Sequence, residues 1–170
     1  DDAYGDLCFH EKDRPRLRPL KAIDPEGIDI CYTGSFSKIL GPGLRLGWLL
    51  APEPIASKCE LLKQSADACS PSFTQVLADA FIRSGKIYPY IEKVRLEYKT
   101  RAEAMSAALR EHLPGYVRWN EPSGGFYIWL NLPESADASE IMKKSIEGGA
   151  VFVAGKTFDP EGIKNNALRL

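Results

Sequence analysis

The amino-acid sequence predicts an α/β protein, on the strength of three local patterns. Two short apolar runs, at 28–33 and 44–50, flank a glycine-rich segment and are typical of buried strands. Apolar residues then recur every three or four positions over 87–113, which indicates one long helix. The aromatic stretch 116–132 that follows is typical of a hairpin. We therefore expect three parts, which are an α/β segment over 1–86, a connecting helix over 87–113 and a smaller α+β lobe over 114–170.

Two helices are expected to follow the second strand. The segment "APEP" precedes a helical stretch over 55–68, and Pro54 suits the first turn of a helix because its missing N–H would have no intrahelical partner there. The segment "CSPS" then interrupts the pattern. A second helix is expected over 72–84, with Ser72 as its cap and Gly85 at its end.

The helix over 87–113 has a consequence for domain organisation. At ~1.5 Å per residue it would span ~40 Å, which is too long for a small single-core domain and suits a helix that bridges two lobes. Pro114 ends it. A hairpin with its turn at 122–125, a short helix at 138–147 and a terminal strand at 167–170 complete the smaller lobe.

The composition is that of a globular chain without the marks of a polyanion partner. Hydrophobic residues make up 44% of the chain, charged residues 26%, and the net charge is -1. Neither a membrane-spanning apolar run nor a signal peptide is evident, so we expect a cytoplasmic protein that binds no membrane and, through this segment, no nucleic acid. The cysteines form no CxxC pair and the two histidines belong to no ligand set, so neither a disulfide framework nor a metal site is expected.

The glycine-rich segment 34–48, "GSFSKILGPGLRLGW", places one lysine among small and apolar residues. Lys38 follows the first predicted strand, and the hydroxyl groups of Ser35 and Ser37, with the glycine backbone, can direct hydrogen-bond donors at an anion. Arg45 stands seven residues after Lys38 and adds a planar fork of donors that suits a phosphate group. These residues predict a phosphate site beside an amine.

The order of the residues decides between two uses of Lys38. In a nucleotide-binding P-loop the lysine follows the glycines and precedes Ser or Thr, whereas Lys38 precedes Gly41 and Gly43. The other use is a nucleophilic amine that forms a Schiff base with a carbonyl group. A single loop lysine usually carries no chemistry, so this hypothesis depends on the residues around it.

The first four residues, "DDAY", match what such an amine would need from a pyridine cofactor. A pyridine ring is an electron sink only while its nitrogen is protonated, and this calls for a carboxylate opposite the nitrogen. Asp1 or Asp2 can fill that place, and Tyr4 can donate a hydrogen bond to the ring hydroxyl oxygen. Without the lysine motif, the aspartate pair would indicate only a turn or a helix cap.

Taken together, "DDAY", "SFSK", the arginine seven residues later, "GGFYIWL" and "NALRL" make the chain similar to the second half of a fold-type I, pyridoxal-phosphate-dependent aminotransferase of class I/II. Within that class, the segments "DDAYGDL" and "GSFSKILGPGLRLGW" resemble those of the branch that contains 2-aminoadipate and aromatic aminotransferases. The same branch includes the aminotransferase-like domains of certain transcriptional regulators. The resemblance covers essentially the whole chain. It implies the C-terminal part of a cofactor-binding large domain with a mainly parallel sheet over 1–86, an interdomain helix over 87–113 and a truncated small domain over 114–170.

The resemblance also implies a role for each matching residue. Lys38 would hold pyridoxal 5'-phosphate as a Schiff base and would carry the proton between the substrate α-carbon and the cofactor. Asp1 would pair with the ring nitrogen and Tyr4 with the ring oxygen. Arg169 would bind the substrate α-carboxylate in a bidentate pair, for which the geometry of arginine is suited. The cofactor phosphate would be held by Ser35, Ser37 and Arg45.

For the whole protein, the resemblance implies a homodimer that transfers an amino group from an amino acid to a 2-oxo acid. The family's first half supplies further cofactor contacts, so we expect the 170 residues to belong to a longer polypeptide and to be inactive alone. Ala154 stands where many relatives have a proline before the glycine, a change that touches no chemistry. The aromatic residues of the smaller lobe are expected in its core, namely Trp119, Phe126, Tyr127 and Trp129.

Two other functions stay open. The ligand-sensing domain of a transcription regulator would keep the Schiff base without turnover, and a winged helix-turn-helix before residue 1 would favour it. A pyridoxal-phosphate-dependent lyase would run a different reaction on the same cofactor, such as β-elimination.

Overall fold

The computed structural model describes residues 1–24 and 26–170, which form two compact units, Asp1–Tyr98 and Lys99–Leu170. The boundary between the units falls inside the longest helix, α3 (Ile87–His112), whose bounds match the predicted helix closely. Helices and strands are mixed in the chain, in agreement with the predicted α/β class. The division into a large-domain part, an interdomain helix and a small domain stays a prediction.

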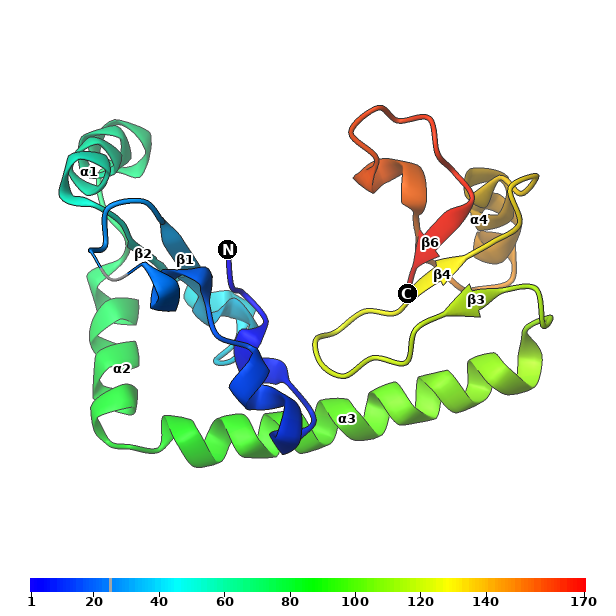
Figure 1. Ribbon diagram of the computed structural model, residues 1–170, viewed down its shortest axis with the longest axis horizontal. Coiled ribbons are helices and arrows are strands. Elements are labelled where there is room, and N and C mark those ends of the chain that lie inside the picture. The colour runs from blue at the N-terminus through cyan, green and yellow to red at the C-terminus, as the bar shows by residue number, and fades with distance from the viewer. Residues whose placement is uncertain (25) are drawn as a thin grey trace. The chain divides into compact units, whose positions relative to one another are not determined.

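The first unit contains a two-stranded sheet (Figure 1). Strand β1 (Tyr32–Ser35) pairs antiparallel with β2 (Gly47–Leu50), and Gly34 lies opposite Trp48. A Cβ atom on Gly34 would come within 2.3 Å of the Trp48 ring, so the ring can lie across the strand only because residue 34 is glycine. This hairpin carries the segment that contains Lys38.

Two helices follow β2 as predicted, α1 (Glu53–Asp67) and α2 (Ser72–Arg83) (Figure 1). Pro54 lies in the first turn of α1. Gly85, with a φ of 70°, follows the end of α2, where a positive φ favours glycine. The prediction that Ser72 caps α2 is wrong, because Pro71 takes the cap position and Ser72 is the first helical residue.

One prediction about the strands of this unit is wrong. Both strands were expected to be buried, yet the side chains of β2 are exposed, Leu50 to 52%. Every strand pair within residues 1–24 and 26–170 is antiparallel, and the mainly parallel sheet of the whole large domain stays a prediction. The connection 36–46 turns straight back through two 3₁₀ turns, whereas parallel neighbours need a crossover of about a dozen residues or more, usually a helix.

The second unit is a four-stranded antiparallel sheet, in the order β3-β4-β6-β5, with one short helix. The strands are β3 (Arg118–Trp119), β4 (Trp129–Asn131), β5 (Val153–Ala154) and β6 (Ala167–Arg169), and the helix is α4 (Ala138–Glu147). The predicted hairpin is the β3 and β4 pair, and the predicted terminal strand is β6. Because β6 is an inner strand, Arg169 lies opposite Trp129 on one side and Val153 on the other.

The core of the second unit is formed by the sheet, α4 and the last turns of α3. In β4 the side chain of Leu130 is buried, while those of Trp129 and Asn131 are exposed, as the period of two along a strand requires. The buried residues of this core are Leu109, Val117, Ile128, Leu130, Ala138, Phe152, Ala154 and Leu168.

The described residues also bear on whether the chain has a membrane span, a metal site or a disulfide. No described helix combines the length and the apolar character that crossing a bilayer requires. No three His, Cys, Asp or Glu side chains among those described are grouped so that they could hold a metal ion. All four cysteines are free thiols, Cys8 buried and the other three exposed.

Candidate functional site

The turn that carries Lys38 begins where β1 ends. Ser35 is the cap of the 3₁₀ turn Phe36–Lys38, and its Oγ accepts a hydrogen bond from the backbone N–H of Ser37 at 3.1 Å. The backbone N–H of Phe36 donates to the carbonyl of Leu46 at 3.0 Å, which extends the pairing of the two strands beyond the sheet. Strand pairing and the serine cap together fix the position from which Lys38 projects.

Arg45 closes the same loop from the other side. Its Nη1 lies 3.4 Å from Ser37 Oγ and 3.3 Å from the carbonyl of Pro42. The backbone of Arg45 is left-handed, with φ 48° and ψ 43°, a conformation that a side chain with Cβ rarely adopts and that recurs at ligand sites. The loop therefore brings together Ser35, Ser37 and Arg45, the three residues predicted to hold a phosphate.

Lys38 and Tyr4 also meet, although they are far apart in the sequence. The Lys38 Nζ lies 5.9 Å from the centroid of the Tyr4 ring, within the range of a cation–π contact. Lys38 is half-buried and Tyr4 is on the surface. The predicted amine and the predicted partner of a ring hydroxyl oxygen thus lie side by side.

The two aspartates at the start of the chain have different surroundings. Asp2 continues the pairing of β1 through a hydrogen bond from its N–H to the carbonyl of Thr33, 2.8 Å long. Its carboxylate accepts hydrogen bonds from the Tyr32 hydroxyl at 2.6 Å and from the backbone N–H of Gly5 at 2.8 Å. Asp1 accepts a longer bond, 3.2 Å, from the Thr33 hydroxyl, and it is exposed. Because protein donors already engage Asp2, Asp1 is the better placed to meet a ligand.

The electrostatic consequence of the Asp2 contact falls on Tyr32. The hydrogen bond to Asp2 raises the pKa of Tyr32 to about 12, and burial of the hydroxyl adds to the effect, because both disfavour a second negative charge beside the carboxylate. Tyr32 therefore stays a neutral donor over the whole physiological range.

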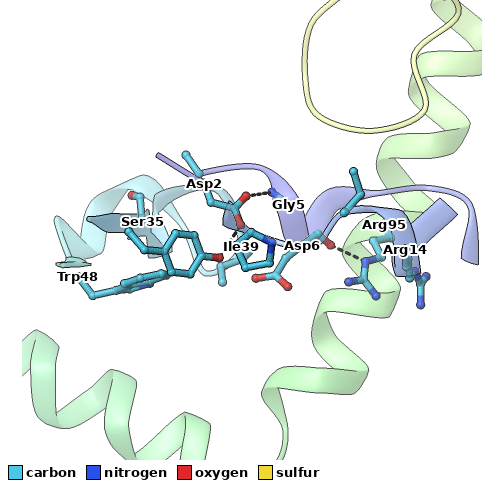
Figure 2. Close-up of a pocket in the computed structure, with 12 residues that line it drawn as sticks. Asp2, Gly5, Asp6, Arg14, Ser35, Ile39, Trp48 and Arg95 are labelled. Carbon is cyan, nitrogen blue, oxygen red and sulfur yellow. Dashed lines mark hydrogen bonds between the residues drawn. The ribbon is translucent and has the colours of Figure 1, made fainter. Parts of the chain in front are cut away.

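A cavity of about 280 Å³ lies beside this hydrogen-bonded group (Figure 2). Figure 2 shows the Asp2 carboxylate turned toward Gly5, with Ser35 and Trp48 along the wall and a hydrogen bond from Arg95 to the backbone of Asp6. Of the candidate residues named from the sequence, Asp2 and Ser35 line this cavity, whereas Lys38, Tyr4 and Arg45 do not.

Arg169 belongs to the second unit and has aromatic surroundings. Its Cζ lies 4.0 Å from the centroid of the Tyr127 ring and 4.5 Å from that of Phe158. Trp129 lies opposite Arg169 in the pairing of β4 with β6. Its ring contacts the Phe158 ring edge to face, with 5.6 Å between the ring centroids. The predicted site residues thus fall into two groups, with Asp1, Tyr4, Ser35, Ser37, Lys38 and Arg45 in the first unit and Arg169 in the second.

Comparison with known proteins identifies the family. The family model for aminotransferases of class I and II matches residues 1–170. The chain belongs to this aminotransferase family. It is 38% identical over 170 residues to aromatic-amino-acid aminotransferase 1 of Thermococcus litoralis, which is all of this chain and 40% of that protein. It is 35% identical to an uncharacterized HTH-type transcriptional regulator of Bacillus subtilis, again over all of this chain and 34% of that protein.

Among solved structures, this member of the aminotransferase family resembles LysN, the α-aminoadipate aminotransferase of Thermus thermophilus, complexed with N-(5'-phosphopyridoxyl)-L-leucine. The two share 35% identity and a TM-score of 0.92, over 100% of this chain and 43% of that chain. The chain therefore spans about two-fifths of the length of the aminotransferases that it matches. The resemblance deduced from "DDAY", "SFSK" and the later motifs is confirmed.

One prediction about the second unit is wrong, because two of the aromatic side chains expected in its core are exposed. Tyr127 and Trp129 were expected in the core, but they are 41% and 40% exposed. The signal was present in "GGFYIWL", because Ile128 and Leu130 are the apolar positions of an alternating strand pattern and so place Tyr127 and Trp129 on the opposite face. Phe158 was not considered as a site residue, and nothing in its local sequence points to Arg169.

Proposed function

We propose that the full-length protein is a pyridoxal-phosphate-dependent aminotransferase that moves an amino group from an amino acid to a 2-oxo acid. The observation that carries the proposal is the placing of Lys38 beside Tyr4, in a loop where Ser37 and Arg45 converge. Family membership supports it, as do the aminotransferase names of the relatives. Because this chain spans about two-fifths of the length of those relatives, the activity is proposed for the full-length protein.

The residues present suit the chemistry of the cofactor. Arg45 offers a guanidinium fork and Ser35 and Ser37 offer hydroxyl groups within one loop, a donor set for a phosphate dianion. Asp1 has an exposed carboxylate, to which the Thr33 hydroxyl donates a hydrogen bond 3.2 Å long, and an exposed carboxylate suits the partner of a protonated ring nitrogen. Tyr4 would donate to the ring oxygen.

Pyridoxal phosphate would supply an electron sink that stabilises negative charge at the α-carbon of an amino acid. Lys38 Nζ would take the proton from that carbon and return it, acting as general base and then general acid. Arg169 would bind the substrate α-carboxylate through two parallel N–H donors. Asp1 would keep the ring nitrogen protonated, because a carboxylate opposite it favours the charged form.

The test is chemical trapping in the full-length protein. Reduction with sodium borohydride, followed by peptide mass mapping, should leave the phosphopyridoxyl group on Lys38. Lys38→Ala should lose this label and lower transamination by roughly 10³-fold, since it removes the acid–base group. Lys63→Ala is the matched control, because Lys63 lies on the outside of α1, paired with Asp67. A label on any other residue would contradict the assignment.

A second candidate is a ligand-sensing domain of a transcription regulator, favoured by the 35% identity with the Bacillus subtilis regulator over all of this chain. Such a domain would bind the cofactor through Lys38 without multiple turnover. Stoichiometric conversion of an amino acid that stops after one equivalent, in the presence of excess 2-oxo acid, would favour the regulator. Release of pyruvate and ammonia in place of transfer to 2-oxoglutarate would favour a lyase.

We also propose that the protein works as a cytoplasmic homodimer. Free thiols at all four cysteines suit a reducing compartment. Large apolar side chains on the outer faces of α1 and α2, such as Leu62 and Phe73, are 70% and 77% exposed and suit burial against further protein. Sedimentation velocity of the full-length protein should give twice the monomer mass, and a monomer that is stable at micromolar concentration would contradict the proposal.

A further inference from the structure

The surroundings of Arg169 are unusual for an arginine on a strand. Its Cζ is 4.0 Å from the Tyr127 ring centroid and 4.5 Å from the Phe158 ring centroid, both within stacking range. Within residues 1–24 and 26–170, the contacts of its guanidinium are with these rings and not with a carboxylate. The aromatic rings therefore position the guanidinium without pairing its positive charge, and a binding site for an anion needs such an available charge.

The two rings come from different parts of the second unit. Tyr127 immediately precedes Ile128, whose N–H and C=O both bond to Leu170, the residue after Arg169. Phe158 ends the 3₁₀ turn Gly155–Phe158, which follows β5. The Trp129 ring packs edge to face against the Phe158 ring, with 5.6 Å between the ring centroids and 72° between the ring planes. Two adjoining strands and a turn thus bring aromatic side chains to one cation.

Both rings leave much of their surface open. Tyr127 is 41% exposed and Phe158 is 43% exposed, so neither serves mainly to fill the core. An unrestrained arginine loses much rotamer freedom when it binds an anion, whereas one already packed against aromatic rings loses less. The two ring centroids lie within 4.5 Å of the guanidinium carbon and so restrict a ligand's approach to it, whereas the N–H groups of a guanidinium match two coplanar oxygens.

We propose that Tyr127 and Phe158 are positioning residues that orient the Arg169 guanidinium and make it select a planar carboxylate over a tetrahedral phosphonate. This inference rests on the proposed function for the assignment of Arg169 to the substrate carboxylate. A carboxylate lies in the plane of the guanidinium. A phosphonate has a third oxygen out of that plane, where it meets an aromatic face in place of water.

The experiment uses the full-length holoenzyme and variants that differ in the presence of a ring. Phe158→Leu and Tyr127→Leu remove a ring and keep apolar bulk, whereas Phe158→Tyr and Tyr127→Phe keep the ring. Tyr116→Leu is the matched control, because Tyr116 is an exposed tyrosine of the same unit, placed before β3. Thermal melting of each variant reports on folding, and two independent ring deletions keep the test usable where one of them fails to fold.

Two measurements separate positioning from a structural role. The first is KM and kcat for the amino donor, where each ring deletion should raise KM about 3- to 10-fold and change kcat less than about 2-fold, as expected for a loss of binding shared by ground state and transition state. The second is the Kd of two unreactive ligands, 3-phenylpropanoate and 2-phenylethylphosphonate. Each ring deletion should reduce the preference for the carboxylate at least about 3-fold. The ring-keeping variants and Tyr116→Leu should behave as wild type.

Unchanged KM and an unchanged carboxylate preference in both well-folded ring deletions would overturn the inference. Equal losses in the ring-keeping and ring-removing variants would do so too, because the ring would then not be the cause. Arg169→Gln distinguishes this outcome from a failure of the proposed function. If Arg169→Gln leaves the Kd of 3-phenylpropanoate unchanged, Arg169 is not the carboxylate site, and the assignment on which the inference rests is itself wrong.

Discussion

At the scale of single residues, the hydrogen bond from Tyr32 to Asp2 connects β1 with the segment that carries Asp1 and Tyr4. Its 2.6 Å length and its charged acceptor make it one of the stronger contacts of the first unit. Removing it with Tyr32→Phe should lower the free energy of unfolding by about 1.5–3 kcal/mol, the range for a hydrogen bond to a charged group. Urea unfolding at pH 8 measures the change, with Tyr88→Phe, an exposed tyrosine, as the control.

The same bond has a defined pH dependence. The pKa of Tyr32 is raised from 10.0 to about 12 in the folded protein, so the protonated hydroxyl is stabilised by folding. This stabilisation is fully present below about pH 10 and is lost as the pH rises from there through about 12. The stability difference between wild type and Tyr32→Phe should therefore shrink over this window. A difference that stays constant up to pH 12 would show that Tyr32 does not donate to Asp2 in solution.

Arg45 combines a ligand role with an unfavourable backbone conformation. A residue with Cβ in the left-handed region costs about 1–2 kcal/mol, and glycine avoids this cost at an entropic penalty of about 0.5–1 kcal/mol. Arg45→Gly should therefore leave the free energy of unfolding of the apoprotein unchanged or raise it by up to about 1.5 kcal/mol. Cofactor affinity should fall roughly 10- to 100-fold, since a charged phosphate contact is lost. Fluorescence titration with pyridoxal phosphate measures the affinity.

The matched variant is Arg45→Lys, which keeps the charge and the Cβ but loses the planar fork. It should keep the stability of wild type and have an intermediate cofactor affinity. If Arg45→Gly bound the cofactor as tightly as wild type, Arg45 would have no part in holding the phosphate.

The grouping of candidate residues could be predicted where the motif is continuous in sequence, but not where it depends on contacts between distant segments. The spacing of Ser35, Lys38 and Arg45 within one loop was readable directly, and the loop does bring Ser37 to Arg45. The bond from Tyr32 to Asp2 joins residues 30 positions apart, and it depends on the pairing of Asp2 with β1. No local pattern encodes that pairing.

At the scale of elements, helices were predicted more closely than strands, and one segment shows why. The apolar run 28–33 predicts a strand over its whole length, but β1 begins only at Tyr32. The Asp24 carboxylate accepts hydrogen bonds from the backbone N–H of Gly27 and of Ile30, both at 3.1 Å. Within the run, Ile30 therefore uses its backbone N–H in a turn and not in a sheet. An apolar run alone does not establish a strand, because a strand also needs a backbone partner with which to pair.

Helix α4 depends on its cap. The Asp137 carboxylate accepts hydrogen bonds from the N–H of Ser139 at 2.8 Å and of Glu140 at 3.2 Å, and also from Asn165 Nδ2 at 2.6 Å. Asp137→Ala should lower the free energy of unfolding by about 1–2 kcal/mol, because the first N–H groups of the helix lose their acceptor. Asp137→Asn, which keeps a capping oxygen, should lose less than half as much. Urea unfolding followed by circular dichroism measures both, and equal losses would show that capping is not the cause.

At the scale of the whole molecule, the predicted residues divide between the two units by chemical role. All residues assigned to the cofactor lie within Asp1–Tyr98, and the residue assigned to the substrate carboxylate lies within Lys99–Leu170. The family resemblance supplied the roles, and these stay predictions. The aromatic surroundings of Arg169 were not predictable, because they combine Tyr127 and Phe158 from separate segments.

This division predicts that cofactor binding and substrate binding can be lost separately in the full-length protein. Arg169→Gln should keep a full equivalent of cofactor, reducible by borohydride onto Lys38, while kcat/KM for the amino donor falls roughly 100-fold through the loss of two charge-assisted hydrogen bonds. Arg45→Gly should show the reverse, with weak cofactor retention and a normal KM once saturating cofactor is added. Absorbance of the bound cofactor and steady-state kinetics measure the two quantities. If Arg169→Gln released the cofactor, the residue would support the cofactor-binding unit itself, and its assignment to the substrate carboxylate would have to be abandoned.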